Sequence, residues 1–223
     1  VQLRDWRKGR LKIYGLKKML REGRVLSGMS LLSPVTAFIE ILGYSGFDYV
    51  FIDTEHTTID LKDLSNLIIA SELSGIASII RVPNNDPTQI RKVFEIGVEG
   101  VIVPHVNTRD DALKAVQAAK FPPEGIRGIG TLVRSSKFGF PKIDFSEYIK
   151  GSNEGTTVIV LIEEEEAVDN IEEILAVKGV DAVLLGPADL SIAMGFPGQY
   201  DNPTVRGELD RVMEAAKRKG IPV

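Results

Sequence analysis

Three stretches of the sequence, FDYVFIDTEH (residues 47–56), VIVLIE (158–163) and AVLLGPAD (182–189), share one pattern: an apolar run that ends in ionisable residues. The runs are rich in valine, isoleucine and leucine, as is typical of β-strands buried on both faces. The charged residues therefore stand where strands end. In parallel α/β proteins the carboxyl ends of the strands form the edge at which ligands bind and chemistry occurs.

Strand-like runs alternate with segments of helical periodicity along the chain. We expect strands at 26–32, 47–53, 77–83, 100–106, 157–163 and 181–186, and the start of a seventh at 221–223. We expect helices at 34–46, 61–75, 87–100, 108–120, 167–179 and 203–220. Continuously apolar strands indicate a parallel sheet covered by helices. Because there is no glycine-rich dinucleotide fingerprint, the pattern favours a (β/α)₈ barrel over a doubly wound sheet.

The length of the chain bears on this prediction. A (β/α)₈ barrel typically needs about 250 residues, and these 223 residues reach only a seventh strand. We therefore expect a single domain over 1–223 whose last strand and helices are missing from this chain. The stretch 121–155 lacks a clear pattern, and we expect a functional or mobile loop there.

Composition narrows the class of protein. A formal net charge of −4 gives no reason to expect nucleic acid or an anionic membrane as a partner. No apolar run approaches the roughly 20 residues of a membrane helix, and residues 1–20 lack the apolar core of a secretory signal. The absence of cysteine excludes disulfides, thiolate catalysis and cysteine-ligated zinc. These features fit a cytoplasmic enzyme that acts on a small molecule.

Glu163 and Asp189 end two successive predicted strands, so their carboxylates should lie side by side. Two carboxylates with open coordination positions suit a hard divalent ion such as Mg²⁺ or Mn²⁺. Either acid alone could instead stabilise the start of the next helix. The adjacent Glu164, Glu165 and Glu166 are expected to form a solvated helix start.

His56 follows Asp53 and Glu55 at the end of its strand. A histidine beside carboxylates is suited to act as a general base near neutral pH. The other histidine, His105, is more typical of a packed or hydrogen-bonded residue. Arg81 ends the third strand and can bind a carboxylate or an enolate oxygen, or form a salt bridge to Asp53 or Glu55; these roles are compatible.

Gly186, Pro187 and Ala188 precede Asp189, and backbone N–H groups of such a turn can hold an anion where a helix begins. A lysine Schiff base is disfavoured because no lysine ends a predicted strand. The chain therefore offers carboxylates, a histidine and an arginine for its chemistry.

Four segments together resemble the HpcH/HpaI family of class II, metal-dependent pyruvate aldolases. They are FDYVFIDTEH (47–56), RVPNNDPTQIRKVFEIGVEGVIVPHV (81–106), FPPEGIRGIG (121–130) and GVDAVLLGPADLSIAMG (179–195). The resemblance spans essentially the whole chain. It implies a (β/α)₈ TIM barrel of the pyruvate/phosphoenolpyruvate superfamily and reversible cleavage of a 4-hydroxy-2-oxo acid to pyruvate and an aldehyde, a carbon–carbon lyase reaction used in aromatic compound catabolism.

The resemblance also implies roles for individual residues. Glu163 and Asp189 match the ligands of a divalent ion, which could be Mg²⁺, Mn²⁺ or Co²⁺. His56 matches the base that takes the proton of the 4-hydroxyl group as the C3–C4 bond breaks. Arg81 matches the residue that faces the negative charge of the pyruvate enolate.

Three further correspondences follow from the same motifs. Ala188 matches a residue whose backbone contacts the pyruvate carboxylate, and Glu95 matches an acid that raises the basicity of the histidine. Leu161 stands where the family often has a substrate-contacting glutamine, and many members carry aspartate in place of Glu95. The family forms hexamers that exchange the last helix between subunits.

Two alternatives stay open from the sequence. A relative that cleaves a CoA thioester should have a basic groove near the strand ends, and none is evident. A non-catalytic barrel that binds an oxo acid would not need His56, Arg81, Glu163 and Asp189 together.

Overall fold

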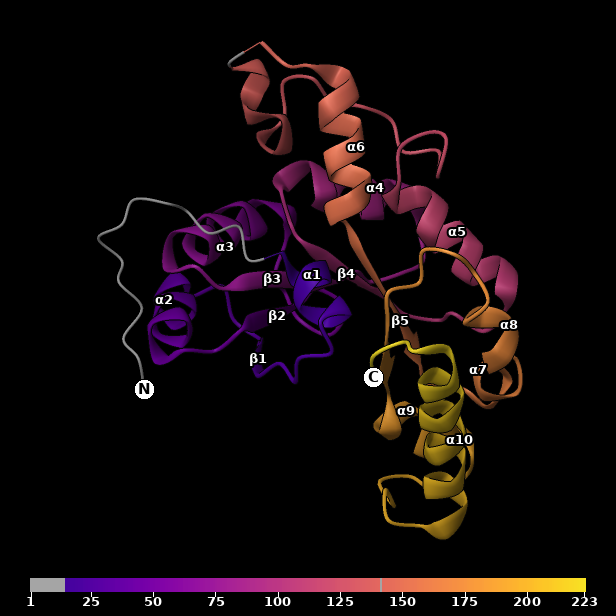
Figure 1. Ribbon diagram of the computed structural model, residues 1–223. Coiled ribbons are helices and arrows are strands. Elements are labelled where there is room, and N and C mark those ends of the chain that lie inside the picture. The colour runs from indigo at the N-terminus through magenta and orange to yellow at the C-terminus, as the bar shows by residue number, and fades with distance from the viewer. Residues whose placement is uncertain (1–14, 141) are drawn as a thin grey trace.

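The computed structural model describes residues 15–140 and 142–223 and contains one six-stranded parallel sheet (Figure 1). The strands follow one another in chain order: β1 (Gly28–Leu31), β2 (Tyr49–Asp53), β3 (Ala77–Arg81), β4 (Gly100–Val103), β5 (Thr157–Ile162) and β6 (Ala182–Leu185). Each lies within a predicted range. The parallel sheet is therefore confirmed, and its six strands form half of a barrel-like fold. The expectation that residues 1–20 carry no secretory signal falls mostly outside the described residues.

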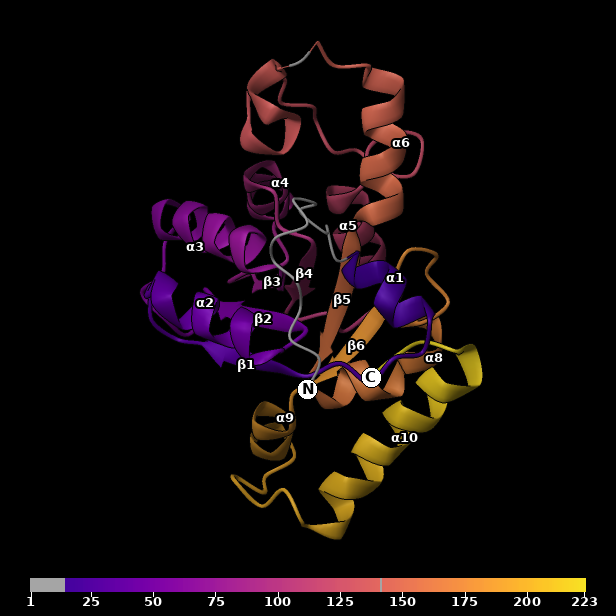
Figure 2. The same cartoon turned by 60° about the vertical axis from the view of Figure 1, so that its left-hand side comes forward.

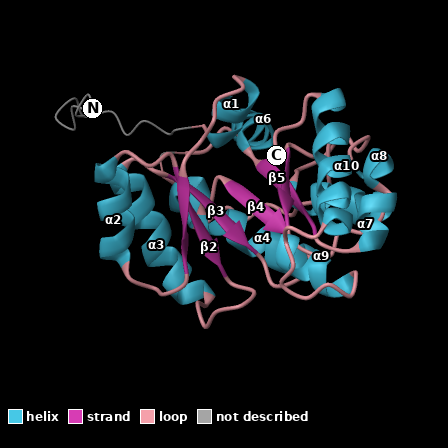
Figure 3. Ribbon diagram, turned by 90° about the horizontal axis from the view of Figure 1, so that it is seen from below, coloured by secondary structure: helices cyan, strands magenta, loops and turns pink. Residues whose placement is uncertain are grey.

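Helices connect the strands. They are α1 (Leu16–Arg21), α2 (Thr36–Ser45), α3 (Leu61–Ser74), α4 (Pro87–Ile96), α5 (Arg109–Ala119), α6 (Phe145–Gly155), α7 (Glu165–Asp169), α8 (Ile171–Ile174), α9 (Pro187–Ala193) and α10 (Pro203–Lys219), with a 3₁₀ segment η2 (Arg134–Gly139). Figure 3 shows α2 and α3 at one side of the strands and α7, α8 and α10 at the other. In the part of the chain that the structure describes, no helix combines the length and the apolar character needed to cross a bilayer.

Three predictions about the ends and continuity of elements need correction. Helix α4 ends at Ile96, before the expected residue 100, because Gly97 adopts a left-handed conformation with φ of 104°. The helix expected at 167–179 is two short helices. Residues 221–223 are not a strand, although Val183 N–H donates to the Pro222 carbonyl at 2.9 Å beside β6; one hydrogen bond is too few to define a strand.

The expected loop at 121–155 contains η2 and an 11-residue helix, α6. The helix begins after Asp144, whose carboxylate accepts hydrogen bonds from the backbone N–H groups of Ser146 and Glu147. Figure 2 shows α6 at the top of the molecule, away from α9 and α10. Much of the segment is therefore ordered secondary structure rather than loop.

Alternate residues of the strands enter two separate cores. The outer face packs on the helices through Val50, Ile52, Ile80, Val101, Val103, Val158, Val160, Ile162 and Val183. The inner face forms a second cluster with Leu16 and Met19 of α1, through Tyr49, Phe51, Ala77, Ile79, Ile102, Ile159, Leu161, Ala182 and Leu184. This two-sided burial explains why the strands lack the polar alternation of a half-exposed sheet.

Helix α1 closes the amino end of the inner face through buried polar contacts. Lys17 Nζ donates to the Thr156 carbonyl at 3.0 Å and pairs with Asp181 at 2.9 Å. The Leu16 N–H donates to Glu99 Oε2 at 3.0 Å, and burial raises the pKa of Glu99 to about 7. The contacts tie α1 to residues that immediately precede β4, β5 and β6.

Replacing Glu99 by glutamine should remove a pH dependence of stability. Between about pH 4.5 and 7 the unfolded chain releases the Glu99 proton while the folded protein keeps it, so the wild-type free energy of unfolding falls as pH rises through this window. Glu99→Gln keeps an acceptor for the Leu16 N–H without the charge, and should be more stable by up to about 3 kcal/mol at pH 8.

Urea unfolding of wild type and Glu99→Gln from pH 4 to 8 measures this difference. Glu154→Gln, at an exposed position, is the control and should follow the wild-type curve. A constant difference between Glu99→Gln and wild type across the range would contradict the prediction.

Candidate functional site

Asp53 and Arg81 end the neighbouring strands β2 and β3 and are register partners across them. Arg81 donates from Nε to Asp53 Oδ1 at 2.9 Å and from Nη2 to Oδ2 at 2.7 Å. Burial raises the pKa of Asp53, but the Arg81 hydrogen bonds and the Glu55 N–H outweigh this effect and lower it overall. The expected salt bridge between Arg81 and Asp53 is therefore present, as a bidentate pair.

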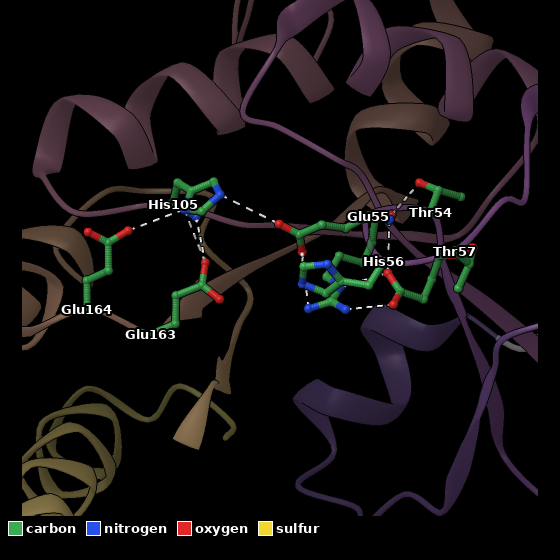
Figure 4. Close-up of polar contacts among 9 residues, drawn as sticks. Thr54, Glu55, His56, Thr57, His105, Glu163 and Glu164 are labelled. Atoms are coloured by element: carbon green, nitrogen blue, oxygen red, sulfur yellow. Dashed lines mark hydrogen bonds and ion pairs between the residues drawn. The ribbon is translucent and has the colours of Figure 1, made fainter. Parts of the chain in front are cut away.

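Glu55 joins this ion pair to both histidines (Figure 4). Its Oε2 lies 3.1 Å from Arg81 Nη1 and 3.8 Å from His56 Nε2, and its Oε1 lies 3.6 Å from His105 Nε2. The carboxylate is largely buried, so these interactions are weakly screened by water. Glu55 thus lies at the centre of the charged groups contributed by β2, β3 and β4.

His56 is the most accessible of these groups, with a side chain that is 65% exposed. Its ring lies nearest Glu55, whereas the Asp53 carboxylate is occupied by Arg81 and by the backbone N–H groups of Glu55 and His56. The structure therefore brings His56 to Glu55 and leaves its ring open to a substrate.

Glu163 follows β5, and its side chain is only 5% exposed. Its Oε1 accepts a hydrogen bond from the His105 N–H at 3.1 Å, so it does not cap the helix that follows. Burial raises the pKa of Glu163 in spite of this hydrogen bond, and the charges of Glu55 and Asp189 raise it further. Asp189 lies in the first turn of α9 after β6 and is exposed. The two predicted ligands therefore lie close enough for their charges to repel.

This repulsion indicates whether the site could hold a cation. A buried carboxylate destabilised by neighbouring acids is stabilised by a divalent ion bound between them. Residues 15–140 and 142–223 contain no group of three or more His, Asp or Glu side chains at metal-binding spacing. Glu163 and Asp189 fit a cation that keeps open positions for water and substrate oxygens, rather than one enclosed by protein ligands.

The turn after β6 packs directly against Glu163. A Cβ atom on Gly186 would lie 2.7 Å from Glu163 Cβ and 3.3 Å from Leu161 Cδ1. Leu161 points into the inner core and is buried. Glycine at 186 therefore lets Pro187 and Ala188 pass close to the end of β5.

Glu95 is not joined to His56. It lies on α4, where Oε1 is 3.4 Å from Arg91 Nη1, and its charge acts on Arg127. None of the hydrogen bonds or ion pairs found among the described residues connects it to His56. The structure places Glu95 with the segment after α5 rather than with the other predicted site residues.

Two more residues join the predicted site residues. His105 is hydrogen-bonded, as expected, but through its contacts to Glu55, Glu163 and Glu164 it is also a central member of the site. Glu164 immediately precedes α7 and is 41% exposed, as expected of a solvated helix start, and its carboxylate also lies 3.2 Å from His105 Nδ1 and accepts a hydrogen bond from Asn107 Nδ2 at 2.9 Å. The available signal was that His105 lies near the end of an apolar strand, as His56 does.

Comparisons with known proteins show what the chain is similar to. The model of the HpcH/HpaI aldolase/citrate lyase family matches residues 26–223. A 5-keto-4-deoxy-D-glucarate aldolase of Salmonella arizonae is 37% identical over 193 residues, which are 86% of this chain and 73% of that protein.

Two solved structures share the fold. An HpcH/HpaI aldolase/citrate lyase family protein from Burkholderia cenocepacia superposes with a TM-score of 0.88 at 32% identity, over 93% of this chain and 82% of that one. The citrate synthase SbnG superposes with a TM-score of 0.84 at 32% identity, over 93% of this chain and 80% of that one.

Gly186→Ala should destabilise the protein by displacing Glu163. The added methyl group would overlap the Glu163 Cβ, and such overpacking typically costs about 1–3 kcal/mol. Gly207→Ala in α10 is a matched control, because a Cβ there meets no atom within 4 Å and alanine favours a helix. Urea unfolding should show a loss for the first variant and none for the second; equal stability of the two would contradict the packing argument.

Proposed function

The chain belongs to the HpcH/HpaI aldolase/citrate lyase family, and from this premise we propose that it is a class II aldolase. It would reversibly cleave a 4-hydroxy-2-oxo acid to pyruvate and an aldehyde with the help of a divalent ion. The observation that supports this most directly is the buried Glu163 next to Asp189, at the strand edge that also carries His56 and Arg81.

The metal site of the proposal consists of Glu163 and Asp189. Members of the family generally depend on a divalent metal, and two carboxylates suit Mg²⁺, Mn²⁺ and Co²⁺ alike. When bound there, the ion supplies a positive charge that polarises the 2-oxo group of the substrate. It would also remove the repulsion that raises the pKa of Glu163.

His56 is the proposed general base. Its ring is exposed at the mouth of the site, and its Nε2 lies 3.8 Å from Glu55 Oε2. His56 accepts the proton of the substrate 4-hydroxyl group as the C3–C4 bond breaks, so that the leaving fragment departs as an aldehyde. In the reverse direction it returns the proton to the new hydroxyl group.

Arg81 and the turn after β6 hold the pyruvate half of the substrate. The pairing with Asp53 and Glu55 fixes the guanidinium, so its charge is in place before the enolate develops. The Ala188 backbone N–H, at the start of α9, is proposed to bind the pyruvate carboxylate. Gly186 and Pro187 shape that turn, and Leu161 forms the apolar floor beneath it.

We also place the six strands in a (β/α)₈ barrel that works as a homo-oligomer, by family resemblance a hexamer. The hydrogen bond from Val183 to Pro222 supports the first point, since it lies on the free side of β6 where the next strand of a barrel would pair.

Cleavage of a CoA thioester is the rival function. A CoA site needs basic groups for its phosphates, but the charged residues described at this edge are mainly acids: Glu55, Glu163, Glu164 and Asp189. The charge of the site therefore favours a small oxo acid held through a cation.

Metal removal tests the proposed class. Excess chelator should abolish pyruvate release from a panel of 4-hydroxy-2-oxo acids that includes 5-keto-4-deoxy-D-glucarate, and Mg²⁺, Mn²⁺ or Co²⁺ should restore it. Glu163→Gln and Asp189→Asn should weaken Mn²⁺ binding measured by calorimetry, whereas Glu165→Gln at an exposed position should not. Full activity in excess chelator would exclude a metal-dependent aldolase.

His56→Ala tests the base. The substitution should lower kcat by about 10²–10⁴, the usual contribution of a general base, while Mn²⁺ affinity stays at the wild-type value. Because the side chain is largely exposed, the thermal midpoint should not change. Turnover equal to wild type would assign the proton transfer to another group.

A further inference from the structure

His105 stands in the turn between β4 and α5 with a left-handed backbone, φ = 55°. This conformation is uncommon for a residue with a side chain and stores strain, which the surrounding structure must offset. The same turn directs the His105 N–H at Glu163 Oε1, 3.1 Å away. Among residues 15–140 and 142–223, it is the one hydrogen bond made to that carboxylate.

The His105 ring fixes the turn from the other side. Nδ1 lies 3.2 Å from Glu164 Oε1, and Nε2 lies 3.6 Å from Glu55 Oε1. Glu164 is held in turn by Asn107 Nδ2 at 2.9 Å. Figure 4 shows the ring between Glu55 on one side and Glu163 and Glu164 on the other.

The proposed function gives Glu163 and Glu55, the neighbours of His105, two different roles. Glu163 belongs to the metal site, and Glu55 lies between His56 and Arg81, which handle the proton and the enolate charge. His105 contacts both sets of residues, and its own ring is 54% exposed. His105 is thus placed to set the distance between Glu163 and Glu55.

We propose that His105 is a positioning residue: its left-handed backbone directs its N–H at the Glu163 carboxylate and so orients that carboxylate for the cation. The inference rests on the proposed function for the identity of the cation, but the orientation of Glu163 is a property of the protein alone. Groups that orient metal ligands through hydrogen bonds typically change metal affinity about 10- to 100-fold when lost.

Three substitutions separate the backbone conformation from simple loss of the ring. His105→Gly and His105→Asn introduce residues that tolerate positive φ, whereas His105→Val introduces a β-branched residue that does not. We expect Mn²⁺ affinity, measured by calorimetry on the folded protein, to fall about 10- to 100-fold for the valine variant. The asparagine variant should stay within about threefold of wild type, with the glycine variant between the two.

Lys137→Val is the matched control, because Lys137 also has a left-handed backbone, with φ of 52°, in η2 far along the chain from the site. It should lower the thermal midpoint much as His105→Val does and leave Mn²⁺ affinity unchanged. Equal Mn²⁺ affinity of His105→Val and wild type would overturn the inference, as would equal losses in all three His105 variants.

Crystal structures of the metal-free variants provide a second measurement that does not depend on the cation. The residue-105 N–H should lie within hydrogen-bonding distance of the Glu163 carboxylate in the asparagine and glycine variants, and should be turned away from it in the valine variant. An unmoved Glu163 in His105→Val would overturn the inference. Failure of the wild-type protein to bind Mn²⁺ would count against the proposed function, and these structures would then decide the positioning role alone.

Discussion

In a β-strand that is buried on both faces, an unpaired charge is too costly to bury, so charged side chains are found where the strand ends. In β2 to β6 the outer face packs on helices and the inner face packs on α1 and the other strands. Because side chains alternate between the faces, the inward row of β2 runs from Tyr49 through Phe51 to Asp53. The inward rows of β3 and β5 end in the same way at Arg81 and Glu163. The charged site is therefore the continuation of the inner core beyond the carboxyl ends of the strands.

The parallel register then decides which charges meet. Asp53 and Arg81 are partners across β2 and β3, so their pairing needs no loop to arrange it. Glu55 and His105 lie in the loops beyond the strands. Glu55 contacts Arg81 and His105, and His105 contacts Glu163, so the two residues connect Arg81 to Glu163. The site thus has one part built on strand ends and another built on the loops that follow them.

The sequence predicts the part of the site built on strand ends better than the part built on loops. All six strands were predicted because an apolar run bounded by turn residues is a local signal. Asp53, Arg81 and Glu163 were identified by the same signal, since each directly ends such a run. The contact between His105 and Glu164 was not predicted because it joins residues 59 positions apart. Helix α6 was missed because its start at Asp144 lies inside a stretch whose glycines and prolines suggested a loop.

Helix α1 connects parts of the chain that are made at very different times. It has only six residues, too few to be stable by itself in water, so its structure depends on the strands it covers. One of its partners, Asp181, lies 164 residues further along the chain than Lys17. Contacts between residues so far apart in the sequence form late in folding and slow the formation of the native state. The segment that leaves the ribosome early thus completes its buried ion pair only after Asp181, the residue that precedes β6, has been synthesised.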